Sequence, residues 1–135
     1  MSSARYLHRV LIALFLAGAV TEFFLAGVGV FGAGSFDAHR GIGNLLLAIS
    51  LLALASAAIA RKFVVHTAVL FVLMVIQYTL VNAGEDASPW IAALHPLNGL
   101  FIVAASGSLA RRAFADVSWP RSRTAPAVTP ARDAS

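Results

Sequence analysis

Four long apolar runs constrain this chain of 135 residues more than any other feature. We expect them at residues 7–31, 39–60, 63–83 and 90–110. Each holds about 20 residues or more, enough for a helix to cross roughly 30 Å of hydrocarbon. A lipid interior admits only helices and closed barrels, and these runs are too long and too uniform for barrel strands. The sequence therefore predicts an all-α fold: a four-helix membrane bundle, up-down-up-down, within residues 1–113.

Composition agrees with this prediction. The chain is 59% hydrophobic and only 12% charged, whereas a soluble domain carries about 25% charged residues. It has no cysteine, which excludes disulfides, thiolate metal sites and iron–sulfur clusters. The basic residues stand at the ends of the apolar runs and in the tail, so the net charge of +4 indicates membrane topology and no nucleic-acid partner. No nucleophile elbow, Walker loop or His-Glu-x-x-His motif is present, and a stand-alone enzyme is not expected.

The distribution of Arg and Lys predicts the orientation of the bundle. With the N-terminus inside, every Arg and Lys except Arg40 lies on the cytoplasmic side, while Asp37, Glu85 and Asp86 lie in the outer loops. Both termini are then cytoplasmic. The preference for Arg over Lys, with abundant Ala and Gly, indicates a bacterial source and hence the inner membrane. Residues 114–135, rich in Pro, Ala, Ser and Arg, are expected to form a disordered basic tail.

The two halves of the chain resemble each other. Residues 22–25 align with 77–80, and Glu22 precedes His39 by 17 positions, whereas Gln77 precedes His95 by 18. Each half ends in a basic pair, at 61–62 and 111–112. This pattern predicts a parallel duplication of one helical hairpin. The second and fourth helices are then symmetry mates, and His39 and His95 face each other across the axis.

The most specific motif is His-x-x-x-Gly, which occurs at 39–43 and 95–99, at the outer ends of two spans. A histidine inside a membrane protein is a functional candidate, and a glycine one turn away leaves a gap on the same helix face. Diagonal helices of a bundle lie about 12–14 Å apart, which two imidazoles and two iron–nitrogen bonds of about 2 Å can span. We therefore expect His39 and His95 to be metal ligands of haem b, with Gly43 and Gly99 beside the ring.

Several alternatives stay open for these residues. Arg40 would pair with a haem propionate or serve as an interfacial anchor. In a second alternative, the two histidines bind another metal. In a third, they hydrogen-bond within helix caps, while the two glycines allow close helix packing. Pro96 disfavours a helical conformation at His95 and predicts a kink near that point.

Glu22 is a charged residue in the outer half of the first span, where a charge is costly. We expect it to form a proton or polar network with Gln77, which occupies the equivalent place in the second half. Glu22 would relay a proton, bind a quinone or orient a ligating histidine; the alternative is a neutral Glu that joins helices through hydrogen bonds. His8 and His66, at the opposite ends of their spans, are interpreted as interfacial.

Across residues 21–110 the chain resembles a family of small uncharacterised four-helix bacterial membrane proteins. The resemblance is carried by residues 24–32, His39, Gly43, Gln77 and residues 94–98. It implies the topology and no activity. In arrangement, His39-Arg40 and His95 are also similar to one half of haem A synthase and to haem bundles of the cytochrome b type, which implies axial ligation by both histidines. The chain departs from the synthase in having Phe36, not an acid, three positions before His39.

The sequence thus predicts an integral membrane protein that binds haem b and transfers electrons, with a quinone or a membrane redox protein as partner. Two alternatives belong to other classes. One is a non-enzymatic interaction or assembly protein, including a homo-oligomer that packs through small residues. The other is a small proton-coupled transporter that uses Glu22.

Overall fold

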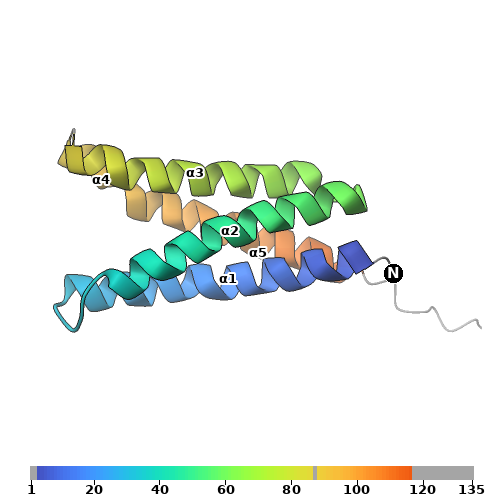
Figure 1. Ribbon diagram of the computed structural model, residues 1–135, viewed down its shortest axis with the longest axis horizontal. Coiled ribbons are helices and arrows are strands. Elements are labelled where there is room, and N and C mark those ends of the chain that lie inside the picture. Colours follow the sequence, from blue (N-terminus) through green and yellow to red (C-terminus); the bar gives the residue numbers. More distant parts are fainter. Residues whose placement is uncertain (1–2, 87, 117–135) are drawn as a thin grey trace, which may run out of the picture.

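The computed structural model describes residues 3–86 and 88–116, and this part of the chain is helical with no strand (Figure 1). The elements are α1 (Ser3–Val30), α2 (Asp37–Ala60), α3 (Val64–Asp86), the short α4 (Pro89–Ala92) and α5 (Leu94–Ala115). Four segments are long and apolar enough to cross a membrane: Ser3–Val30, Asp37–Ala60, Val64–Asn82 and Pro89–Ala115. The predicted all-α fold and its four spans are confirmed.

The helices extend beyond the apolar runs from which they were predicted. The first begins at Ser3, not residue 7, the third continues to Asp86 through part of the expected loop, and the last continues to Ala115. Hydropathy locates the part of a helix that lies in hydrocarbon, whereas polar residues at its ends remain helical in the headgroup region. The tail prediction falls mostly on residues 117–135, which lie outside the described residues.

The four spans form a ring in the order α1, α2, α3, α5. Each helix packs against its two neighbours in this ring, while the backbones of the diagonal pairs, α1 with α3 and α2 with α5, do not approach one another among the described residues. Figure 1 shows α2 crossing between α1 and α3, with α5 behind it. The second and fourth spans are therefore diagonal, as the expected four-helix arrangement requires.

Tight connections hold the hairpins together. After α1, Gly32 adopts a positive φ of 70° and the Ala33 N–H donates to the Val28 carbonyl at 2.9 Å, which is the Schellman pattern of a helix end. After α2 the same pattern is built on Arg61, with a φ of 52°, and Phe63 also has a positive φ of 61°. Residues other than glycine rarely adopt a positive φ, so the α2–α3 connection is a strained, very short turn.

The bundle axis is filled with apolar side chains between two polar ends. The core includes Ile12, Phe15, Leu46, Leu70, Ile102 and Leu109, all almost fully buried. Ser50, Thr67 and Ser106 are buried among them. The Ser50 and Ser106 hydroxyls donate to carbonyls of their own helices, and the Thr67 hydroxyl donates to the Phe63 carbonyl just before α3. Apolar side chains therefore make up most of the core between the two polar ends.

Candidate functional site

The end of the bundle that carries the α1–α2 and α3–α4 connections contains a cluster of polar side chains from all four spans. We name it the imidazole cluster: Glu22 from α1, His39 from α2, Gln77 from α3, and His95 with Asn98 from α5. Four of these residues are partly buried and Asn98 is only 7% exposed. Polar side chains inside an apolar bundle are stabilised by pairing and hydrogen-bonding with one another.

Helical periodicity explains why these side chains point inward. On α1 the buried face runs through Phe15 and Ala19 to Glu22, at spacings of four and three residues. On α5 His95 precedes the buried Asn98 by three residues and so lies on the same face. The inward faces of α1 and α5 therefore carry polar side chains where they reach this end of the bundle.

Glu22 contacts His39 within the first hairpin. Its Oε2 atom lies 2.5 Å from His39 Nδ1, and both side chains are largely shielded, with 15% and 21% of their surface exposed. The contact lacks hydrogen-bond geometry, because His39 Nδ1 has no hydrogen-bond partner among the described residues. The other carboxylate oxygen, Oε1, is buried and has no hydrogen-bond partner among the described residues. A polar atom left in this state costs about 1–3 kcal/mol.

Gln77 contacts His95 within the second hairpin. The Gln77 side-chain Nε2 donates to His95 Nε2 at 3.2 Å, and the His95 Nδ1–H donates to the Gln77 backbone carbonyl at 3.4 Å. Asn98 Nδ2 donates to Gln77 Oε1 at 2.6 Å and to the Leu73 carbonyl at 3.0 Å. These partners define a neutral His95 with its proton on Nδ1 and a lone pair on Nε2.

The two histidines meet near the bundle axis. Their ring centroids are 6.0 Å apart and the ring planes are inclined by 73°. They come from α2 and α5, whose backbones are diagonal and do not touch. The structure thus brings together the pair that the internal repeat predicted, together with the Glu22 and Gln77 side chains that precede them by 17 and 18 positions.

The two glycines do not frame an open slot. A Cβ atom added at Gly99 would lie 3.3 Å from Phe23 Cζ and 3.6 Å from Gln77 Nε2. One added at Gly43 would lie 4.0 Å from Glu22 Oε2. The space expected for a flat ligand is therefore filled on the Gly99 side by the Phe23 ring and the Gln77 amide, and on the Gly43 side it adjoins the Glu22 carboxylate.

Arg40 lies apart from the cluster. Its side chain is 69% exposed and makes a surface ion pair with Asp37 at 3.7 Å.

The break in the last span falls at Ala93, between α4 and α5, so that His95 and Pro96 lie in the first turn of α5. The predicted kink is thus displaced by two residues from His95, and Pro96 is tolerated there because first-turn N–H groups need no helical acceptor.

The opposite histidines do not form a second matching pair. His8 is 2% exposed and packs within the bundle, whereas His66 lies exposed on α3. Within residues 3–86 and 88–116, no group of three or more His, Cys, Asp or Glu side chains is arranged to hold a metal ion.

Sequence reasoning did not include Asn98 or Phe23 among the site residues, although Asn98 is one of the residues 94–98 that carry the family resemblance. Asn98 orients the Gln77 amide, and Phe23 covers Gly99. The position of Asn98, three residues after His95 on an amphipathic face, was a usable signal. Nothing in the sequence indicated Phe23, which is 41% exposed and resembles the other lipid-facing aromatics.

Comparison with known proteins agrees with the expected resemblance to an uncharacterised family. Residues 22–84 match the model of a family described as "Family of unknown function (DUF6220)". The match includes Glu22, His39 and Gln77 and ends before His95. No curated protein and no solved structure matches the chain.

Proposed function

We propose that the imidazole cluster binds haem b between His39 and His95, and that the chain is a membrane electron-transfer protein. One observation carries this proposal: two imidazoles from diagonal helices meet with their ring centroids 6.0 Å apart. Two metal–nitrogen bonds of about 2 Å, together with the distance from each ligating nitrogen to the centroid of its ring, place the two ring centroids about 6 Å apart. Haem iron with two histidine ligands supplies one-electron transfer and has no open position for oxygen.

The state of His95 supports a ligand role. Ligating histidines generally donate one ring N–H to a carbonyl or carboxylate, which orients the ring and leaves the other nitrogen basic. The His95 Nδ1–H donates to the Gln77 carbonyl at 3.4 Å, and the Nε2 lone pair accepts from the Gln77 amide at 3.2 Å. A bound metal would take the place of that amide hydrogen.

Glu22 supports the same role for His39. The carboxylate already lies 2.5 Å from Nδ1, and a small rotation of the ring would create the hydrogen bond that orients Nε2 toward His95. The buried and unpartnered Glu22 Oε1 indicates that protein atoms alone do not complete the cluster.

Space for the ring depends on Phe23. Its Cζ lies 3.3 Å from the position of a Cβ atom added at Gly99. The same side chain lines an apolar groove together with Phe24, Gly27, Val28, Phe31 and Ala33. Admitting a porphyrin requires the Phe23 ring to leave Gly99 and turn toward this groove. The exposed Arg40 would then pair with a propionate at the membrane edge.

Proton-coupled transport through Glu22 is the second candidate, favoured by the contact of Glu22 with His39. The core weighs against it. From Glu22 to His8 the distance along α1 is roughly 20 Å at about 1.5 Å per residue, and the buried core in between is mostly apolar. A site that is accessible from one side suits electron transfer to a quinone or redox protein better than it suits a transmembrane path.

The proposal includes an orientation. Except for Arg40, the basic residues of the described part lie at the end of the bundle where α1 begins and α5 ends. This end therefore faces the cytoplasm of a bacterial cell, and the imidazole cluster lies at the outer side of the inner membrane.

One observation favours the interaction or assembly alternative: Gly27, Gly41 and Gly107 have no atom near their missing Cβ positions, as at surfaces where a second helix packs.

The decisive experiment is the visible spectrum of detergent-purified protein from cells supplied with a haem precursor, recorded oxidised and dithionite-reduced. We expect a low-spin haem b spectrum that is lost in His39→Ala and in His95→Ala. His66→Ala is the matched control, because His66 is exposed on α3, and should retain the spectrum. A folded, colourless protein that does not take up added haem would exclude the proposal.

A further inference from the structure

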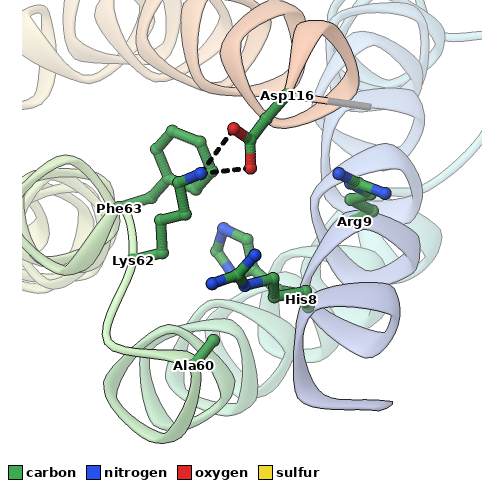
Figure 2. Close-up of a pocket in the computed structure, with 7 residues that line it drawn as sticks. His8, Arg9, Ala60, Lys62, Phe63 and Asp116 are labelled. Atoms are coloured by element: carbon green, nitrogen blue, oxygen red, sulfur yellow. Dashed lines mark hydrogen bonds and ion pairs between the residues drawn. The ribbon is translucent and has the colours of Figure 1, made fainter. Parts of the chain in front are cut away.

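A second polar cluster lies at the opposite end of the bundle and takes no part in the proposed haem site. We name it the basic cluster: Arg5, His8 and Arg9 from α1, Lys62 from the α2–α3 turn, and Asp116 at the end of α5 (Figure 2). Three cationic side chains thus surround a single carboxylate. They line a cavity of about 10 Å³, which has room for no more than about one water molecule.

His8 is the buried base of this cluster. It is 2% exposed, its Nδ1 lies 3.1 Å from the Ala53 carbonyl and 3.3 Å from Ser56 Oγ, and its ring stacks on Phe63. Its Nε2 is buried and has no hydrogen-bond partner among the described residues. Because Nδ1 is anchored to a carbonyl, protonation would add a second N–H on Nε2, which is free to meet an anion.

The cations are positioned by the fold. The Arg9 Nε–H donates to the Ala113 carbonyl at 2.7 Å, which ties α1 to the end of α5. Lys62 is held in the strained turn and forms an ion pair with Asp116, as Figure 2 shows. The Lys62 ammonium, with weaker contributions from Arg5 and Arg9, holds the pKa of Asp116 below its usual value. The carboxylate therefore occupies a position where the chain stabilises negative charge.

We propose that the basic cluster is a binding site for the phosphate group of an anionic phospholipid, and that Asp116 holds this site when no lipid is bound. The cluster lies at the end of four membrane-spanning segments, the depth at which headgroups lie. Basic pockets between helices on this side of a membrane bind such headgroups. Because the cavity is small, the phosphate enters by displacing the Asp116 carboxylate from Lys62.

The test uses the full-length chain in neutral detergent and measures retention of phosphatidylglycerol by native mass spectrometry, with phosphatidylcholine as the uncharged reference. Lys62→Gln should bind about fivefold more weakly, the factor that one basic side chain contributes near an anionic membrane. Arg5→Gln, in an exposed residue, should weaken binding similarly without disturbing the core. Asp116→Asn should bind more tightly, because the competing carboxylate is gone.

Arg111→Gln is the matched control, since Arg111 is exposed at the same end of the bundle but does not line the cavity. An equal loss of binding in Arg111→Gln would overturn the proposal in favour of general surface attraction. Unchanged or weaker binding in Asp116→Asn would overturn the displacement. Retention of inorganic phosphate alone, equal to that of phosphatidylglycerol, would overturn the lipid assignment in favour of a soluble anion. None of these outcomes depends on haem.

Discussion

His39 and His95 place their rings 6.0 Å apart although they belong to helices that are diagonal in the bundle. The glycine one turn after each histidine faces a side chain of α1: a Cβ atom added at Gly43 would lie 4.0 Å from Glu22 Oε2, and one added at Gly99 would lie 3.3 Å from Phe23 Cζ.

The contacts of the two histidines repeat between the hairpins. Glu22 touches His39, and Gln77 touches His95, so residues at equivalent places of the internal repeat make equivalent contacts. The partners differ in charge, since a carboxylate serves one histidine and an amide serves the other.

The hydrogen bonds of Asn98 should make it the most important structural residue of the imidazole cluster. Asn98→Ala removes two hydrogen bonds and leaves Gln77 Oε1 without its donor. We expect a loss of about 1–2 kcal/mol in the free energy of unfolding, measured by denaturant titration in mixed micelles. Asn44→Ala is the control because Asn44, beside the other glycine, is exposed. Equal effects of the two substitutions would contradict the assigned network.

Close packing of α1 on α2 depends on Gly18. A Cβ atom added there would lie 2.7 Å from Leu46 Cδ2, and Leu46 is only 3% exposed. We expect Gly18→Ala to destabilise the bundle by about 1–3 kcal/mol through overpacking. Gly107→Ala should leave stability unchanged or slightly raised, since no atom lies within 4 Å of its added Cβ. Thermal unfolding monitored by circular dichroism compares the two variants directly.

Hydropathy predicted the four spans, and the internal repeat predicted that the second and fourth helices are symmetry mates with His39 and His95 facing each other across the axis. These features follow from local pattern and from the requirement that apolar runs cross the bilayer. Sequence could not predict that Phe23 covers Gly99, because this contact depends on the crossing of α1 and α5. It also could not predict that His8 is buried while His66 is exposed, because both stand at similar depths in similar apolar runs.

Stability should depend on pH through Asp116. Its pKa in the folded chain lies below the ordinary value of 3.8, so the folded state binds its proton less readily than the unfolded state does. The stability that the Lys62–Asp116 pair adds is therefore fully present above pH 3.8 and is lost as pH falls through the lowered pKa. Asp116→Asn should lower the unfolding temperature at neutral pH, and its effect should diminish as pH falls through the lowered pKa of Asp116. In a Lys62→Gln background the same substitution should have a smaller effect, since only the weaker contributions of Arg5 and Arg9 remain, and a full effect there would refute the pairing.

Phe23 should control access to the proposed haem site. Phe23→Ala removes the ring that lies over Gly99, so the added space between α1 and α5 should let apo-protein take up haem faster in stopped-flow absorbance measurements. The matched control is Phe24→Ala, because Phe24 lines the same apolar groove and is 71% exposed, but is not among the atoms nearest Gly99. Acceleration in Phe23→Ala alone would identify the Phe23 ring as the barrier, since both side chains line the groove but only Phe23 is among the atoms nearest Gly99. If both variants take up haem at the native rate while still forming the low-spin spectrum, the ring enters by another route. If the Phe23 variant takes up haem more slowly, Phe23 packs against the bound ring and does not obstruct it.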